Sequence, residues 1–441
     1  MLIKFSLRNY KVFRDKVELS LIASNYDKDT NEENVFEVPK YDLRLLKSAV
    51  VYGANASGKS KLIEALSFMR YFVRSSSKDK QKGEEIPIAP FRLSTLSENE
   101  PSEFEVTFIY KDVLYRYGFE ATPCEIVSEW LYYRPNTKEV EVFYRSKQEF
   151  ELHKRGLSSI VNQLVKGENI RENALLISVA AQFNDKIASA VLDWFTELRT
   201  ISGLREEGYK GFTISMVEKS AVKIHILKML QLADLGISDI TAKAFDPNNL
   251  SNDLPDEVKE FIQKRVSDDK ADFLNDVQTS HPKYDEFNRI IDQVLFSMDE
   301  DESSGTKKFF ALTGPLLDVL ADGATFFVDE LDAKMHPNLV CAIVHFFHSP
   351  RTNPKNAQLI FNTHDTNLLG VNSFRRDQIW FTEKDRYGAA TLYSLADYKP
   401  RKGENFEHNY IRGKYGAIPY LSDFSRLFDN SENLIHAGTE E

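Results

Sequence analysis

Residues 53–60 read Gly-Ala-Asn-Ala-Ser-Gly-Lys-Ser, which is the spacing of a phosphate-binding loop. An apolar run precedes the loop at residues 49–52, and apolar residues recur at helical spacing after it, over residues 61–69. In such a strand–loop–helix unit, backbone N–H groups surround a phosphate and the helix N-terminus faces it. A glycine-bearing turn without this role would not require Lys-Ser at its end.

The loop therefore predicts a nucleotide site that depends on Mg²⁺. We expect Lys59 to reach the β- and γ-phosphates, and the Ser60 hydroxyl to complete the metal site. The residues expected to contact the phosphates are Gly53, Asn55, Ala56, Ser57, Gly58, Lys59 and Ser60.

A magnesium site of this kind needs a carboxylate at the end of a second strand. Residues 324–328 are mostly apolar and β-prone, as in a strand buried in a parallel sheet, and Asp329 and Glu330 follow them. We expect Asp329 to organise the metal and Glu330 to orient and polarise an attacking water. The pair predicts hydrolysis of the nucleotide. Considered alone, it could also be an acidic cap at a strand end.

Two further segments carry polar groups suited to a phosphate. Ser303, Ser304 and Gly305 open a helix-like stretch and predict a second anion site, which would serve another subunit's nucleotide. A helix N-cap by either serine explains these residues equally well. His364 follows a buried-strand pattern at residues 358–363, where a histidine can sense the γ-phosphate, although an isolated histidine is more often structural.

Length, composition and charge narrow the class of protein. The 441 residues exceed one ordinary core, so two lobes are expected. The net charge of −11 argues against a protein that coats DNA with its whole surface. Cys124 and Cys341 indicate neither a disulfide framework nor a zinc hook, and no apolar run approaches a membrane span. We therefore expect a cytoplasmic protein with no membrane partner.

The periodicity of the chain predicts insertions between the strands of the nucleotide core. Residues 1–24 predict a strand pair, and residues 104–145 an antiparallel meander. Residues 173–298 predict a largely helical block, with clearer helices at 174–181, 187–198, 222–233 and 254–266. Residues 251–302 hold fifteen Asp or Glu against six Lys or Arg. This charge run indicates a solvated helical face, with a docking surface for a basic partner as the alternative.

The order of these motifs resembles that of the ABC-type ATPase heads of SMC, Rad50 and RecF proteins. It is most similar to the bacterial AAA-family ATPases of the abortive-infection and OLD type. The segments that carry the resemblance are residues 5–13, 173–184, 303–312, 329–337 and 412–419. It implies an α/β fold, namely a P-loop NTPase with an ABC-type head, an antiparallel β subdomain and a helical insertion.

The resemblance also implies an organisation of the chain. Residues 1–150 would be the N-terminal part of the ATPase head, with the phosphate loop and the meander. Residues 151–300 would be a mainly helical insertion. Residues 301–424 would complete the head with the signature-like loop, the acidic strand end and the switch histidine, and residues 425–441 would be a polar tail.

In such families two heads sandwich two ATP molecules. By resemblance, Ser303 and Gly305 would contact the γ-phosphate bound to the partner head, and Asp332 would lie in the loop between the two sites. His364 would be the switch histidine, and Lys11 would lie near the nucleotide. The signature-like loop reads Glu-Ser-Ser-Gly-Thr in place of Leu-Ser-Gly-Gly-Gln.

The resemblance implies an ATPase of an anti-phage system, similar to the Septu and PARIS types. ATP-driven head dimerisation would control a separate effector, a nuclease or toxin encoded nearby. One alternative is a RecF-like ATPase that binds DNA in repair, for which nucleic acid is a partner. Another is a nucleotide-gated scaffold that traps an effector.

Overall fold

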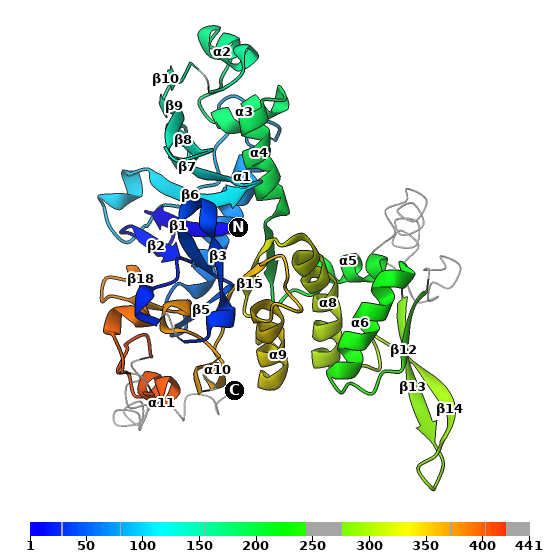
Figure 1. Cartoon of the computed structure of the whole chain (residues 1–441). Coiled ribbons are helices and arrows are strands. Elements are labelled where there is room, and N and C mark those ends of the chain that lie inside the picture. The colour runs from blue at the N-terminus through cyan, green and yellow to red at the C-terminus, as the bar shows by residue number, and fades with distance from the viewer. Residues whose placement is uncertain are drawn as a thin grey trace, which may run out of the picture.

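The computed structural model describes residues 1–27, 30–79, 81–154, 156–243, 276–370, 373–401 and 403–419. The helix expected at residues 254–266 and the tail expected at residues 425–441 lie outside these ranges. Two large sheets, a set of helices and a projecting hairpin make up the fold (Figure 1). No helix in the described ranges combines the length and hydrophobicity needed to cross a bilayer.

The central sheet has six strands in the order β11-β15-β16-β5-β17-β18. Its strands are β5 (Ser48–Gly53), β11 (Arg199–Ser202), β15 (Thr325–Asp329), β16 (Gln358–Asn362), β17 (Ile379–Lys384) and β18 (Ala390–Ser394). All neighbours pair in parallel except β17 and β18. Every residue of β5 and β16 is buried, as expected for inner strands of a parallel sheet. The strands expected before Asp329 and before His364 are confirmed.

The second sheet is antiparallel and has seven strands in the order β10-β9-β8-β7-β6-β1-β2. Its strands are β1 (Leu2–Arg8), β2 (Val17–Ser20), β6 (Ser102–Tyr110), β7 (Val113–Ala121), β8 (Ile126–Arg134), β9 (Val140–Ser146) and β10 (Glu149–Leu152). The N-terminal strand pair and the meander are therefore both confirmed. Pairing of β1 with β6 joins them into one sheet. A small separate ladder joins β3 (Val35–Val38) to β4 (Leu43–Leu46).

Helix α1 (Lys59–Ser75) lies between the two sheets. Its buried side chains, such as Leu62 and Leu66, share one hydrophobic core with strands of the antiparallel sheet and with Phe327 and Ile360 of the central sheet. Helices α8 (Ser304–Asp322) and α9 (Pro337–His348) cover the opposite face of the central sheet. Two apolar layers therefore enclose the central sheet. The short helices α10 (Asn367–Gly370) and α11 (Phe406–Ile411) follow β16 and β18 along the chain.

The insertion contains helices α2 (Ser159–Lys166), α3 (Leu176–Gln182), α4 (Lys186–Glu197), α5 (Glu207–Val217) and α6 (Ser220–Leu232). Helices α3, α4 and α6 confirm the expected ones. The expectation of helix up to residue 298 is wrong, because β12 (Asp239–Lys243), β13 (Asp276–Tyr284) and β14 (Ile290–Ser297) form an antiparallel sheet. β14 is rich in β-branched and aromatic residues, which favour strand, and residues 285–289, four of which are polar or charged, supply the turn.

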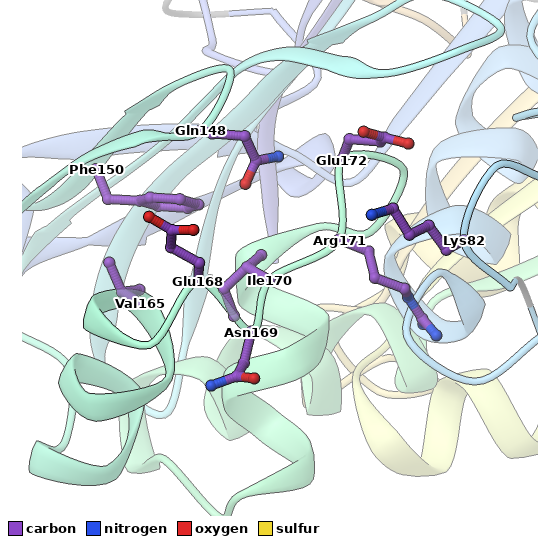
Figure 2. Close-up of a pocket in the computed structure, with 9 residues that line it drawn as sticks. All are labelled: Lys82, Gln148, Phe150, Val165, Glu168, Asn169, Ile170, Arg171 and Glu172. Atoms are coloured by element: carbon purple, nitrogen blue, oxygen red, sulfur yellow. The ribbon is translucent and has the colours of Figure 1, made fainter.

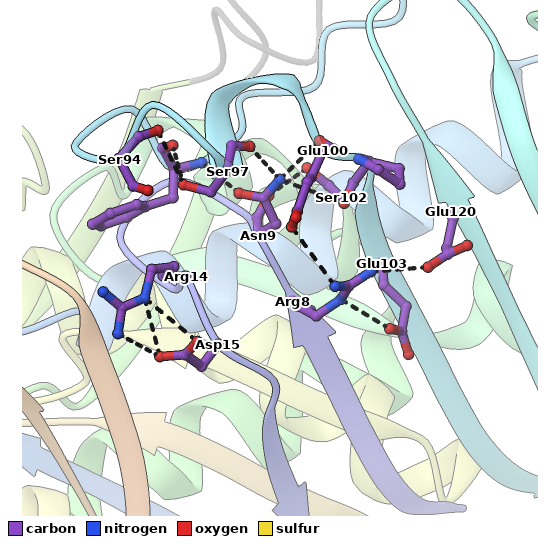
Figure 3. A network of polar contacts seen from close by, with 12 residues as sticks. Arg8, Asn9, Arg14, Asp15, Ser94, Ser97, Glu100, Ser102, Glu103 and Glu120 are labelled. Carbon is purple, nitrogen blue, oxygen red and sulfur yellow. Dashed lines mark hydrogen bonds and ion pairs between the residues drawn. The ribbon is translucent and has the colours of Figure 1, made fainter.

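The loop after β1 is fastened by a buried asparagine (Figure 3). The Asn9 amide donates to the carbonyl oxygens of Ser97 at 2.7 Å and Glu100 at 2.8 Å, and its side-chain oxygen accepts from the Phe91 N–H at 3.0 Å. Farther along the loop, the carbonyl oxygen of Val12 accepts from the N–H of Ala390 in β18 at 2.8 Å. The loop therefore bridges the antiparallel sheet and the central sheet.

A buried ion pair joins the meander to helix α3. Glu129 and Arg145 are both fully buried and their charged groups lie 3.6 Å apart. The Glu129 carboxylate also accepts from the backbone N–H groups of Leu176 and Ile177, at the α3 N-terminus. Burial raises the pKa of Glu129 and lowers the pKa of Arg145, against the attraction between the two groups.

Replacing Arg145 by Met leaves the buried carboxylate without its cation. We expect the free energy of unfolding in urea to fall by about 3–5 kcal/mol. The control is Lys4→Met, which breaks the exposed pair of Lys4 with Glu18 in the same sheet and changes stability by less than about 1 kcal/mol. Equal effects of the two substitutions would contradict the importance of the buried pair.

Candidate functional site

The glycine-rich loop between β5 and α1 is held close to its neighbours. Gly58 has a φ of +123°, and a Cβ there would lie 3.2 Å from side-chain atoms of Phe13 and Ala390. A Cβ at Gly53 would lie 2.4 Å from the carbonyl oxygen of Thr382. The Ser57 hydroxyl is also 2.6 Å from the Thr382 hydroxyl. The tertiary structure therefore requires both glycines.

Lys59 begins α1 and folds back over the loop. Its side chain is buried, and Nζ donates to the carbonyl oxygens of Gly53 at 2.8 Å and Ala54 at 3.1 Å. Burial lowers the pKa of Lys59 to about 8, although the charge of Glu330 acts in the opposite direction. The amine is thus a desolvated cation whose partners are neutral carbonyl oxygens. An anionic ligand would stabilise its charge better and could replace these carbonyls as its partner.

The acidic strand end is oriented by an asparagine that no sequence motif had indicated. The Asn362 amide donates to the Asp329 carboxylate at 2.6 Å, and its oxygen accepts from the Glu330 N–H at 2.5 Å. Asn362 is fully buried at the end of β16, which lies between β5 and β15. The signal in the sequence that could have indicated this role is an amide residue at the end of a buried-strand pattern. One side chain therefore fixes both acidic residues relative to the phosphate loop.

Ser60 and Asp329 line one cavity of about 470 Å³. A cavity of this size falls in the range of small-molecule sites. Ser202, the last residue of β11, and Arg205, which follows that strand, line the same cavity and were not anticipated. The structure therefore brings together the two residues predicted to hold the metal, and the donor set of one hydroxyl and one carboxylate suits Mg²⁺.

A buried lysine of α8 connects to this acidic strand end. Lys308 Nζ donates to the carbonyl oxygen of Gly203, whose N–H donates to the Asp329 carbonyl oxygen at 2.6 Å. Burial lowers the pKa of Lys308 to about 8. The start of α8 and the end of β15 are therefore linked through a single residue after β11. No sequence motif predicts a role for Lys308.

His364 and Asp332 lie together beside the acidic strand end. The backbone N–H of His364 donates to one carboxylate oxygen of Asp332 at 3.2 Å. The other oxygen of Asp332 is buried and has no hydrogen-bond partner among the described residues. Burial and the positive charge of Lys59 lower the pKa of His364 below its ordinary value, so the imidazole is neutral at pH 7.

The signature-like loop is separate from the cavity of its own chain. Ser303 is the N-cap of α8, because its side chain accepts from the Thr306 N–H at 3.1 Å. This is the helix N-cap that the sequence offered as the alternative to an anion site. A Cβ at Gly305 would lie 2.9 Å from the carbonyl oxygen of Lys334, two residues after Asp332. Neither Ser303 nor Gly305 is among the described residues that line the cavity.

Lys11 lies next to α1, and its amine forms an ion pair with Glu64. Glu64 lines the same cavity as Ser60 and is one turn farther along α1. A second cavity, of about 390 Å³, is lined by Phe150, Arg171 and their neighbours (Figure 2). It contains none of the predicted site residues and belongs to the end of the molecule that carries β10 and α2 (Figure 1).

These features define the class of protein. A parallel sheet carries a glycine-rich loop with Lys-Ser after β5, and an acidic strand end on β15, with β16 between them. This is the arrangement of a P-loop NTPase domain.

Residues 48–370 match the family model described as "AAA domain, putative AbiEii toxin, Type IV TA system". The chain belongs to this family. No match was found among curated proteins.

Several solved structures are similar to this chain at low identity. The SMC head domain from Thermotoga maritima is 12% identical, with a TM-score of 0.40, over 89% of this chain and 98% of that one. An Smc head domain with an extended coiled coil, bound to the C-terminal domain of ScpA derived from Pyrococcus furiosus, is 13% identical, with a TM-score of 0.35, over 90% and 97%. CbiO1 from Clostridium perfringens, part of the ABC transporter complex cbiONQ, is 10% identical, with a TM-score of 0.27, over 87% and 95%. The assignment to the family rests on the family match.

Substitution of Asn362 by Asp tests the orientation of the acidic strand end. The new carboxylate would stand against Asp329, so the two would repel or share a proton. We expect the Mg²⁺-dependent part of the affinity for a fluorescent ATP analogue to fall about 10–100-fold. Binding without Mg²⁺ should change little. The exposed Asn338→Asp is the matched control, and equal losses in both variants would contradict the assignment.

Proposed function

We propose that this protein hydrolyses ATP with Mg²⁺ between two associated heads, and that head association controls a separate effector protein. The observation that carries the proposal is the Asn362 side chain, which forms hydrogen bonds to both Asp329 and Glu330. Asp329 lines the same cavity as Ser60. A nucleotide store would need no such acidic pair.

The phosphate loop would bind ATP through its backbone N–H groups and Lys59. The Lys59 amine would leave the carbonyls of Gly53 and Ala54 for the β- and γ-phosphate oxygens, and its pKa would rise toward the ordinary value beside that negative charge. Mg²⁺, when bound, would screen the charge of the phosphate oxygens. Ser60 and Asp329 are the residues that would hold it.

Glu330 would orient the attacking water and accept its proton. Its backbone has a φ of +53°, held by the hydrogen bond from its N–H to Asn362, so its direction is set by the fold. His364, neutral at pH 7, would form a hydrogen bond to the γ-phosphate. Lys11 would contribute positive charge near the nucleotide through its position beside α1.

Two features support completion of each site by a second head. Ser303 and Gly305 open α8 but do not line their own chain's cavity, among the residues described. Asp332, which lies between the acidic strand end and Gly305, has a buried oxygen without a described partner. Ser303 and Gly305 would therefore contact the γ-phosphate bound to the partner head, and Asp332 would connect the two sites.

The family description names a toxin of a toxin–antitoxin system. This description supports a toxin–antitoxin setting for the family, and the controlled partner that we propose within it is a nuclease or toxin encoded nearby, in anti-phage defence. Purification of the Glu330→Gln protein, expressed with the products of adjoining genes, tests this part. A co-purifying nuclease or toxin is expected, whereas DNA alone would indicate a repair ATPase.

Replacing Glu330 by Gln keeps the size of the side chain and removes the base. We expect ATP turnover to fall about 10²–10⁴-fold, while a nucleotide-bound dimer accumulates with ATP and Mg²⁺. Light scattering after size-exclusion chromatography measures the dimer. The exposed Glu98→Gln is the control, and a Glu330→Gln protein that stays monomeric would contradict the two-head proposal.

A mixing experiment tests whether Ser303 acts on the partner's nucleotide. Ser303→Asp keeps an N-cap for α8 but places a carboxylate where the phosphate is expected. Lys59→Met disables the phosphate loop. Each variant alone should be inactive, whereas an equal mixture should recover up to about a quarter of the wild-type turnover, because heterodimers contain one complete site. No recovery would contradict action in trans.

A further inference from the structure

Strands β13 and β14 form a hairpin that extends beyond α6, away from both large sheets (Figure 1). The inner end of the small sheet is part of the core, because Ile240, Val277 and Met298 are buried against the helical part of the insertion. The outer part leaves this core, and its apolar side chains are not covered by the described residues.

β14 exposes apolar side chains and an unpaired strand edge. Ile290, Ile291 and Leu295 are 63%, 60% and 61% exposed. In the part of the chain that the structure describes, β14 pairs with β13 alone, so it is the edge strand of its sheet. An exposed apolar edge strand offers unpaired backbone groups and invites aggregation unless a partner covers it.

The apolar side chains of β14 lie on both faces of the sheet. Side chains alternate along a strand, so Ile291 and Leu295 share one face while Val294 and Phe296 share the other. A further strand beside β14 would therefore gain backbone hydrogen bonds and apolar contacts on both faces. This is the chemistry of recognition by β-strand addition.

Charge indicates the kind of partner. Residues 277–302 contain seven Asp or Glu and two Lys or Arg. The exposed acidic side chains include Asp292 in β14 and Asp299 and Glu300 after it. Pairing with a second copy would bring together two segments that each carry five more acidic than basic side chains, seven against two. A basic segment avoids this repulsion.

We propose that β14 is a docking strand for an extended segment of the effector protein, in which apolar and basic residues alternate. The segment adds to the free edge of β14 as a fourth strand of the small sheet. This inference deepens the proposed function and rests on it, because it supplies the surface through which the controlled partner is held.

The base of the hairpin is connected to the signature-like loop. The Thr279 hydroxyl donates to the Glu302 carboxylate at 2.6 Å, and a ring nitrogen of His281 lies 2.8 Å from the same oxygen. Glu302 directly precedes Ser303, the N-cap of α8. A partner held on β14 is therefore attached to the element that would contact the other head's nucleotide.

The test uses the full chain and a fluorescein-labelled ten-residue peptide in which Lys and Val alternate. Fluorescence anisotropy should show binding that weakens at least tenfold in Leu295→Lys, which removes apolar contact and repels the peptide. The matched control is Ile224→Lys on α6, which alters a side chain that is 65% exposed and should bind like the wild type. Thermal unfolding midpoints of both variants should match the wild type, because both sites are exposed.

Two control peptides define the recognition. A peptide of alternating Glu and Val, and a Lys and Val peptide with proline at alternate valines, should each bind at least tenfold more weakly than the probe. The docking proposal is overturned if the wild type does not bind the probe, if Leu295→Lys binds it equally, or if the acidic peptide binds as well. It is also overturned if Leu295→Lys dissociates a dimer that forms without nucleotide, because the occupant would then be a second copy.

ATP turnover is measured on the wild-type and Leu295→Lys preparations used for probe binding, and nucleotide-dependent dimerisation is measured in parallel on the Glu330→Gln protein. Loss of probe binding with normal turnover rejects the docking strand and leaves the ATPase proposal standing. Probe binding without any turnover or dimer rejects the ATPase proposal and leaves the docking strand standing.

Discussion

Parallel backbone pairing of β5 with β16 and β17 is the constraint on which the rest of the site depends. Val51 pairs with Asn362, and Gly53 with Thr382, so segments more than 300 residues apart end at the same edge of the sheet. Pairing of β15 with β16 brings Asp329 to that edge as well. Ligands of open α/β sheets bind at the carboxyl ends of the strands, and here that edge carries the phosphate loop and both acidic residues.

Buried polar groups then convert this arrangement into a defined geometry. The partners of Lys59, Asn362 and Lys308 are backbone or side-chain groups of the surrounding loops and strands. A buried polar group that loses its partner is costly, so each of these contacts resists displacement of the element that carries it. Lys308 extends this network from the end of β15 to α8. The start of α8 therefore cannot move without affecting the acidic strand end.

The insertion places the proposed docking strand away from the cavity, yet direct contacts connect the two. The hairpin of β13 and β14 projects from the helical part, while its base is bonded to Glu302. Glu302 leads into Ser303, and Gly305 lies against the loop that contains Asp332. A short path of direct contacts therefore joins an exposed edge strand to the loop beside His364.

The sequence by itself determined the parts whose geometry is local. The phosphate loop was predictable because strand, glycines, Lys59 and Ser60 are contiguous, and the meander because period-two alternation and its turns lie within 42 residues. The apolar run before Asp329 likewise predicted a buried strand. Only the tertiary structure decided the contacts of Asn362, the pairing of β1 with β6 and the burial of Lys308. Those features depend on contacts between distant segments, and the periodicity of a sequence reports only how a segment presents its own faces.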